Sequence, residues 1–349
     1  MRAGRIVGEG YHRRYGGPHA EVHALAAAGR RARGADVYVT LEPCSHQGKT
    51  PPCSDALVGA GVARVFYASR DPNPATRGRG PRRLGRAGIP TVLGPCEAEA
   101  LALNETYFYF HRSGRPWFLL KWAMSLDGKM ATAGGESQWI TGEAARSYAH
   151  GLRRRVDAIL VGTDTARADD PELGPRPPRG RFPFRVVLDR TGRLSLGLRV
   201  LREPFLREAS SPASGELVFG SGQTIYVTSL KTPRRRLQQL AARGVFVVQI
   251  PARRGALDID ALAEVLGGSG ISQVLVEGGG KLAGSFLERR QVQEVAVFVA
   301  PRLIGGKDAP SPLGGRGVAS LVETPWLDSM RVRRLGSDWL VAGRVKSHA

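Results

Sequence analysis

The sequence predicts an α/β protein built from two domains, and three observations support this prediction. With 349 residues, the chain is long enough for two domains of ordinary size, each with its own hydrophobic core. Apolar runs typical of buried strands alternate with helix-compatible segments in both halves of the chain, which favours layers of sheet and helix. Residues 111–116 read as a linker, so we predict one domain at residues 1–113 and a second at residues 114–349.

The first half carries alternating strand and helix signals that predict a three-layer α/β/α sandwich. The predicted strands are rich in β-branched and aromatic residues, and the first helix is an Ala-rich run that stops near Gly29. The last segment has an Ala/Leu-rich helical beginning and an aromatic end. In chain order, we expect these elements at residues 4–10, 21–30 and 36–41, from 53 onward, and at 63–68 and 97–109.

The second half begins with an apolar strand at residue 117 that runs into an Asp-Gly turn. A polar loop at 163–173 is expected to contain a helical turn. Near the end, a strand leads through three glycines into a helix. The remaining expected elements are a helix at 143–156 and strands at 157–162, 184–188, 224–227 and 273–277.

Composition and charge limit the class of protein. The formal net charge is +20, and 44 of the 51 basic residues are arginine, scattered through both halves. This charge leaves a zinc-stabilised nucleic-acid-binding protein as an alternative of another class, although an anionic small substrate would benefit equally from the positive field. Three cysteines do not make a disulfide framework, and no run of about 18 apolar residues predicts a membrane span. We therefore expect a cytoplasmic protein with neither a nucleic-acid nor a membrane partner.

Two short segments together predict a catalytic zinc site. Residues 18–22 offer the imidazole of His19 and the carboxylate of Glu21, and residues 43–53 offer the thiols of Cys44 and Cys53, each directly after a proline. One His and two Cys leave a fourth position on tetrahedral Zn²⁺ for water, whose pKa the metal lowers to about 7. Glu21 would then carry protons, as in zinc nucleobase deaminases. Each residue alone would more often be an ordinary core residue, but their combination favours the metal.

A second candidate site lies at the glycine turn of residues 278–280, between a strand and a helix. Glycines let backbone N–H groups at a helix N-terminus approach a phosphate. The turn alone is weak evidence, because it lacks the Gly-x-Gly-x-x-Gly pattern and lies near the C-terminus. A tight structural turn explains it equally well.

Four motifs resemble the bifunctional deaminase–reductase family of riboflavin biosynthesis, in that family's order along the chain. They are Pro-Cys-Ser-His-Gln-Gly-Lys-Thr-Pro-Pro-Cys at 43–53, Lys-Trp-Ala-Met-Ser-Leu-Asp-Gly-Lys at 121–129, Gly-Glu-Ser-Gln-Trp-Ile-Thr at 135–141 and Ala-Asp-Asp-Pro-Glu-Leu at 168–173. The nine-residue spacing of the two cysteines is typical of this branch of the zinc deaminases. The resemblance implies a cytidine-deaminase-like N-terminal domain and a dihydrofolate-reductase-like C-terminal domain. The family fold begins with a helix and a strand that we expect this sequence to lack, so a reductase whose deaminase domain is impaired by N-terminal truncation remains an alternative.

The resemblance also implies two reactions. The first is zinc-dependent hydrolytic deamination of 2,5-diamino-6-ribosylamino-4(3H)-pyrimidinone 5′-phosphate, and the second is reduction of the ribosyl chain to ribityl by NADPH. A phosphorylated pyrimidine is thus the expected small-molecule substrate. The family further implies a homo-oligomer assembled through the reductase domain.

Residue by residue, the resemblance assigns the following roles. Glu21 is the catalytic acid/base, and His19, Cys44 and Cys53 hold the zinc. The deaminase substrate would contact His12, His46, Lys49 and Asn73. NADPH would border Ala123, Trp139, Thr165, Asp169, Gly279 and Gly280. The substrate of the reductase would border Lys121, Ser137, Arg153, Leu173, Arg176 and Glu277.

Overall fold

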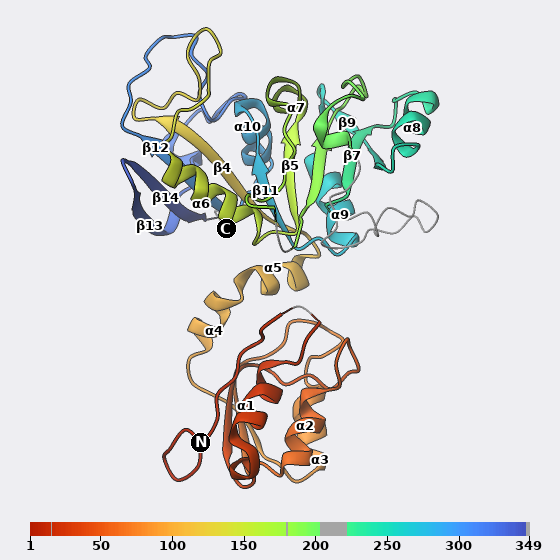
Figure 1. Cartoon of the computed structure of the whole chain (residues 1–349), viewed down its shortest axis with the longest axis vertical. Coiled ribbons are helices and arrows are strands. Elements are labelled where there is room, and N and C mark those ends of the chain that lie inside the picture. Colours follow the sequence, from red (N-terminus) through yellow and green to blue (C-terminus); the bar gives the residue numbers. More distant parts are fainter. Residues whose placement is uncertain (15, 179–180, 203–221, 347–349) are drawn as a thin grey trace. The chain divides into compact units, whose positions relative to one another are not determined.

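The structure is a computed structural model that describes residues 1–14, 16–178, 181–202 and 222–346 (Figure 1). It divides into two compact units, Met1–Ser113 and Gly114–Ala349. The helices of the first unit are α1 (Ala20–Ala28), α2 (Cys53–Ala60), α3 (Arg79–Arg86), α4 (Glu97–Leu103) and α5 (Glu105–Ser113), with a 3₁₀ turn at Gly29–Ala32. Its strands are β1 (Asp36–Leu41), β2 (Arg64–Ser69) and β3 (Thr91–Leu93).

The described strands of the first unit form one parallel sheet in the order β1-β2-β3. Helices α2 and α3 pack on one face, where Leu57, Val65 and Leu84 form a fully buried cluster with Leu25 of α1 against it. The segment after β1 and the starts of α1 and α2 then carry the predicted metal ligands. This arrangement follows from the strand-helix alternation of the sequence.

Two predictions about the first unit were wrong. Residues 4–10 form no strand, only a single bridge between Arg2 and Arg5. The physical reason lies in the glycines, since a Cβ on Gly8 or Gly10 would lie 2.4 or 2.3 Å from a carbonyl oxygen of α1. The segment therefore packs against the backbone of a helix. The second error concerns residues 97–113, where the helix is interrupted at Asn104 and continues to Ser113, so residues 111–113 are helical and not linker.

The second unit contains five helices in its described part, α6 (Glu143–Arg153), α7 (Thr163–Asp169), α8 (Arg234–Ala241), α9 (Ile259–Gly268) and α10 (Gly280–Glu288). Its large sheet has the order β13-β14-β12-β4-β11-β5-β6-β7-β8. In chain order these strands are β4 (Trp117–Ser125), β5 (Ala158–Gly162), β6 (Phe184–Leu188), β7 (Thr224–Ser229), β8 (Phe246–Ile250), β11 (Gln273–Glu277), β12 (Glu294–Ala300), β13 (Leu327–Leu335) and β14 (Asp338–Val345). A small hairpin joins β9 (Ala252–Arg253) to β10 (Ala256–Leu257), and 3₁₀ turns occupy Arg199–Leu201 and Leu321–Glu323.

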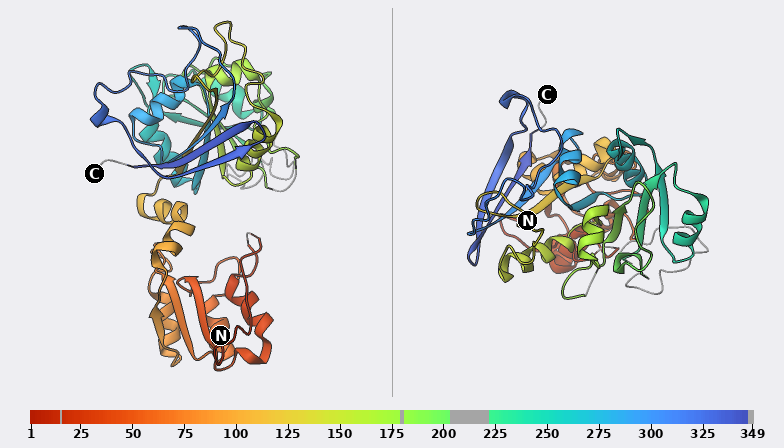
Figure 2. Two further views of the ribbon diagram at one scale, coloured as in Figure 1. Left: turned by 90° about the vertical axis from the view of Figure 1, so that its left-hand side faces the viewer. Right: turned by 90° about the horizontal axis from the view of Figure 1, so that it is seen from above.

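Helices cover both faces of this sheet, so the second unit has three layers. One buried cluster contains Phe118 of β4, Leu262 of α9 and Phe286 of α10. The other contains Leu275 of β11 with side chains of α6, α7 and α8, such as Leu152. Strands β4, β5, β6, β7, β8, β11 and β12 run parallel, while β13 and β14 pair antiparallel at one edge, where they form the long dark-blue hairpin of Figure 2.

Side chains alternate between the two faces along each strand. Leu119 projects from β4 toward the face covered by α6. Lys121 and Ala123 follow it at spacings of two and therefore project toward the same face. In β11, Leu275 and Glu277 share that face, and Glu277 lies opposite Lys121 in the ladder. The register thus brings two predicted site residues together from segments far apart in sequence. No helix of the described residues is long and apolar enough to cross a membrane.

Candidate active sites

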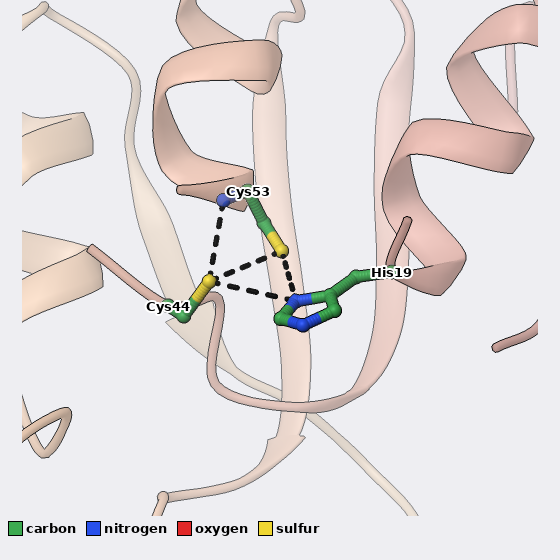
Figure 3. Close-up of side chains that lie close together, drawn as sticks. All are labelled: His19, Cys44 and Cys53. Carbon is green, nitrogen blue, oxygen red and sulfur yellow. Dashed lines mark hydrogen bonds between the residues drawn. The ribbon is translucent and has the colours of Figure 1, made fainter. Parts of the chain in front are cut away.

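Three predicted zinc ligands converge in the first unit (Figure 3). His19 is the N-cap residue of α1, Cys44 lies just after β1, and Cys53 is the first residue of α2. His19 Nδ1 lies 2.8 Å from Cys53 Sγ and 3.5 Å from Cys44 Sγ, and the two sulfur atoms are 3.3 Å apart. The three donor atoms therefore face one common point.

This donor set fits a zinc ion. Bonds of about 2.3 Å to sulfur and 2.0 Å to nitrogen in a tetrahedron require donor atoms roughly 3.5–3.8 Å apart. The His19–Cys44 separation of 3.5 Å matches this range, while the Cys44–Cys53 and His19–Cys53 separations of 3.3 and 2.8 Å are shorter and would widen around a bound ion. One imidazole and two thiols are ligands that zinc prefers, and they leave a fourth position for a water or substrate oxygen.

Local hydrogen bonds favour a thiolate at the site. Hydrogen bonding with Cys53 lowers the pKa of Cys44 to about 5, and the Cys53 backbone N–H also donates to Cys44 Sγ at 3.3 Å. The bond to Cys44, followed by burial, raises the pKa of Cys53. Cys53 thus holds its proton more tightly than Cys44, and a bound cation would displace that proton because a coordinating thiol is deprotonated.

Glu21 lies in the first turn of α1, two residues after His19. Burial raises the pKa of its carboxyl group, and this pKa also responds to Cys53 through a side-chain hydrogen bond and to the charge of His19. The carboxyl group therefore lies directly beside the three ligands. A half-buried acid with a raised pKa is suited to accept and return a proton.

The four residues predicted to contact the deaminase substrate lie on three segments. The His12 ring centroid is 5.7 Å from that of His19, which places this exposed side chain at the edge of the metal site. His46 and Lys49 occupy the exposed loop between the two cysteines, and His46 Nδ1 is 3.3 Å from Thr76 Oγ1. Asn73 is half-buried after β2, where its Oδ1 accepts the Ala75 N–H at 3.0 Å.

In the second unit, the predicted residues centre on a bidentate ion pair. Arg153, the last residue of α6, donates through Nε and Nη2 to the Glu277 carboxylate at 2.9 and 2.7 Å. Its Nη1 donates to the carbonyl of Gly174 at 3.0 Å, next to the buried Leu173. Burial alone would raise the pKa of Glu277, but the charges of Arg153 and Lys121 outweigh it and lower the pKa to about 2.

The glycine turn lies beside this pair, directly after Glu277. The Gly279 N–H donates to Thr165 Oγ1 of α7 at 3.2 Å, and Gly280 begins α10. A Cβ on Gly280 would lie 2.5 Å from the carbonyl oxygen of Ser311, so only glycine fits there. Asp169, at the end of α7, has its pKa raised by burial and partly lowered again by the charge of Lys121. These contacts gather Lys121, Thr165, Asp169 and the turn around one end of the sheet.

Three predicted residues make no hydrogen bond to this centre in the described part of the chain. Ser137 and Trp139 are on an exposed loop, where the Arg146 guanidinium lies 4.7 Å from the Trp139 ring centroid. Within the described part of the chain, neither side chain makes a hydrogen bond or ion pair with the cluster. The exposed Arg176 accepts a bond from Arg154 through its carbonyl oxygen, so its guanidinium is not fixed by that contact. Ala123 lies on the same face of β4 as Lys121.

The structure adds His150, which the sequence did not single out. This half-buried side chain of α6 lies one turn before Arg153, and its buried Nδ1 has no hydrogen-bond partner among the residues that the structure describes. Burial and the charges of Arg153 and Arg176 lower its pKa to about 4. The i, i+3 spacing of His150 and Arg153 on one helix is the sequence signal that could have found it.

A basic cavity of about 690 Å³ was also missed. It opens where β6, β7 and β8 end, beside the N-terminus of α8, and its described lining contains no acidic side chain. The turn after β6 is built on Asp189, which accepts the Leu194 N–H at 2.8 Å and the hydroxyl of the buried Tyr226. The cationic lining residues are Arg190, Arg193, Lys231 and Arg236.

Comparison with protein-family models matches both units. Residues 1–69 match the cytidine and deoxycytidylate deaminase zinc-binding region, and residues 116–341 match the RibD C-terminal domain. Among curated relatives, the riboflavin biosynthesis protein RibD of Escherichia coli (strain K12) is 40% identical over 97% of this chain and 89% of its own length. RibD of Actinobacillus pleuropneumoniae is 38% identical over 98% of this chain and 86% of its own length.

Solved structures give the same result. Form 1 of Acinetobacter baumannii RibD has a TM-score of 0.83 and 34% identity, covering 99% of this chain and 91% of its own. The diaminohydroxyphosphoribosylaminopyrimidine deaminase/5-amino-6-(5-phosphoribosylamino)uracil reductase of Thermotoga maritima has a TM-score of 0.79 and 32% identity, covering 99% and 90%. The predicted fold class and family are therefore confirmed. This chain belongs to the RibD family of riboflavin biosynthesis proteins, with the deaminase and the reductase both represented in it.

Proposed function

We propose that residues 1–113 form a zinc-dependent deaminase domain that acts on 2,5-diamino-6-ribosylamino-4(3H)-pyrimidinone 5′-phosphate. The observation that carries this proposal is the convergence of His19 Nδ1, Cys44 Sγ and Cys53 Sγ beside Glu21. These three residues would hold Zn²⁺, which when bound supplies hydroxide near neutral pH.

Glu21 moves the protons of this reaction. Its carboxylate accepts a proton from the attacking water and delivers it to the ring nitrogen, and then passes the proton of the newly added hydroxyl group to the departing amine. The new C–O bond replaces the C–N bond, and ammonia leaves. His12, His46, Lys49 and Asn73 bind the substrate, with His46 and Lys49 on the phosphate because both lie in the exposed inter-cysteine loop. Burial around Glu21 suits this role, since it raises the pKa toward the working range of a general acid/base.

We propose further that residues 114–349 form the reductase domain, which reduces the ribosyl chain of the deaminated product to ribityl. The nicotinamide cofactor supplies the hydride when bound, and the protein orients it. Ala123, Trp139, Thr165, Asp169, Gly279 and Gly280 border the cofactor, and Thr165 fixes the turn through the Gly279 N–H.

The substrate of the reductase borders the cluster around the ion pair. Lys121 and Arg153 supply positive charge, and Glu277 holds the Arg153 fork in one orientation. Ser137, Leu173 and Arg176 complete the set, Leu173 by packing and Arg176 through its exposed guanidinium, which suits a phosphate.

The basic cavity supports NADPH over NADH as the cofactor. The two cofactors differ by one phosphate on the adenosine ribose, and a pocket with four cationic side chains favours the phosphorylated form. The glycine turn follows β11, and the cavity follows β6 and β7, two to three strands away in the sheet. At about 4.8 Å per strand this separation is roughly 10–14 Å, within the reach of an extended dinucleotide.

The expected assembly is a homo-oligomer formed through residues 114–349, and this expectation is testable by light scattering. A chain that fails to form dimers or larger assemblies at micromolar concentration would contradict it.

One variant tests the deaminase assignment inside the same polypeptide. Glu21→Gln keeps the shape of the side chain and leaves the three metal ligands intact, so zinc content should equal that of the wild type. Ammonia release should fall by at least about 10²-fold, since general acid/base catalysis is worth that much. NADPH oxidation on the deaminated intermediate should persist unchanged. Glu99→Gln, an exposed change on α4, is the matched control. Ammonia release that survives in Glu21→Gln would refute the role of Glu21.

A further inference from the structure

Two buried carboxylates lie beside the metal-ligand candidates without belonging to them. Glu42 is 4% exposed and Asp71 is 5% exposed. Glu42 follows β1 and precedes Cys44 by two positions, while Asp71 follows β2 by two positions. A carboxylate is costly to bury unless its oxygens accept hydrogen bonds. The groups that donate hydrogen bonds to these two carboxylates therefore show which segments the carboxylates hold in place.

Glu42 holds both ends of the loop at residues 71–78. Its Oε2 accepts the Asp71 N–H at 3.3 Å, and its Oε1 accepts the Gly78 N–H. Two residues farther on, a Cβ on Gly80 would lie 1.8 Å from the Pro43 carbonyl oxygen. The glycine therefore lets the start of α3, directly after the loop, pack on the backbone that joins Glu42 to Cys44.

Asp71 fixes the interior of the same loop and connects it to α5. Its Oδ1 accepts the Asn73 N–H at 2.9 Å and the Tyr107 O–H at 2.9 Å. Burial and the neighbouring Asp71 raise the pKa of Tyr107, so the phenol stays protonated and remains a donor. The connection ties the loop to a helix that lies outside the matched zinc-binding region of residues 1–69.

The clamped loop presents two of the proposed substrate contacts. Asn73 is part of it, and Thr76 Oγ1 lies 3.3 Å from His46 Nδ1. Thr76 is 1% exposed, so its hydroxyl has a fixed position from which to orient the exposed imidazole. Displacement of the loop would therefore move Asn73 and release His46 together.

We propose that Glu42 and Asp71, with Tyr107, are positioning residues that fix the loop 71–78 and thereby place Asn73 and His46 for the deaminase substrate. This inference rests on the proposed deaminase function. None of the three residues touches the reacting atoms, and each acts through the loop. Their loss should weaken substrate binding more than it slows the chemical step.

The test uses the full chain and measures KM and kcat for ammonia release, zinc content, and NADPH oxidation on the deaminated intermediate. Tyr107→Phe removes one donor and Glu42→Gln replaces one acceptor oxygen by an NH₂ group that faces a backbone N–H. Each should raise the deaminase KM about tenfold, the value of one ordinary hydrogen bond, with kcat changed less than about twofold. Zinc content and reductase activity should match the wild type. Asp71→Asn keeps the oxygen acceptor and should be closer to wild type than Asp71→Ala.

Tyr38→Phe is the matched control, because it removes an exposed phenol hydroxyl on β1 of the same unit. An unchanged KM in Tyr107→Phe would overturn the inference, even if Glu42→Gln failed to fold. Loss of zinc together with a fall in kcat would also overturn it, since that result indicates a general structural role. Absence of ammonia release from the wild type would instead refute the proposed function itself, and the inference with it.

Discussion

The Arg153–Glu277 pair offers a sharp prediction about the second unit. The change is Glu277→Gln, which removes the charge and keeps the shape of a side chain that is 11% exposed. In the folded protein, the charges of Arg153 and Lys121 lower the pKa of Glu277 from 4.5 to about 2, against the opposing effect of burial. At about 1.4 kcal/mol per pKa unit, this difference corresponds to roughly 3 kcal/mol of folding free energy at neutral pH. Removing one partner of a buried pair costs a similar amount, about 3–5 kcal/mol.

The sign of the pH dependence follows from the direction of the shift. Because the pKa is lower in the folded state, the stabilisation is complete above the unfolded value of 4.5 and disappears as the pH falls toward about 2. The difference in unfolding free energy between wild type and Glu277→Gln should therefore be constant from pH 8 to about 5.5 and shrink below pH 4.5.

Denaturant titration followed by tryptophan fluorescence measures this difference selectively, because all five tryptophans lie within residues 114–349. The matched control is Glu294→Gln on β12, whose Arg331 partner is 3.4 Å away and has a side chain 72% exposed. An exposed pair contributes at most about 1 kcal/mol, so the control should differ little from wild type. Equal losses in both variants, or a loss in Glu277→Gln that does not change with pH, would refute the reasoning.

Two further predictions concern the metal site and the basic cavity. Cys44→Ser and Cys53→Ser should each reduce zinc to well below one ion per chain, measured by atomic emission. Both variants should lose ammonia release, while NADPH oxidation on the deaminated intermediate continues. Full zinc occupancy in either variant would contradict the ligand set. Lys231→Ala and Arg193→Ala should each raise the KM for NADPH by about tenfold and leave the KM for NADH unchanged, because one charge-assisted bond to the additional phosphate is lost. Lys307→Ala, a change outside the cavity lining, is the control, and equal effects on both cofactors would exclude a role in phosphate recognition.

The fold was predictable where local signals agree with tertiary packing. Strand β1 occupies the predicted 36–41, and α1 and α2 begin within one residue of their predicted starts. The strand predicted at residues 4–10 was wrong because Ile6 and Val7 suggest a strand, whereas the close approach of Gly8 and Gly10 to α1 depends on tertiary contacts. Strand β13 carries no clear signal, since nearly all its side chains are exposed at the edge of the sheet.

The two candidate sites also differ in how far the sequence alone could predict them. The metal ligands lie within 34 residues of one another in short motifs, so sequence spacing alone indicates the chemistry. The Arg153–Glu277 pair joins residues 124 positions apart, and only the ladder register and the end of α6 bring them together. The basic cavity needs three strand ends and a helix at once, and Glu42 and Asp71 are single acids whose burial no local pattern announces.

The central claim is that one imidazole and two thiolates hold a zinc ion next to Glu21. X-ray absorption at the zinc edge of the purified full-length protein measures this coordination directly. The expected spectrum has two sulfur atoms at about 2.3 Å and two nitrogen or oxygen atoms at about 2.0–2.1 Å. A shell of four sulfurs, a shell without sulfur, or a protein that retains no zinc would contradict the assignment.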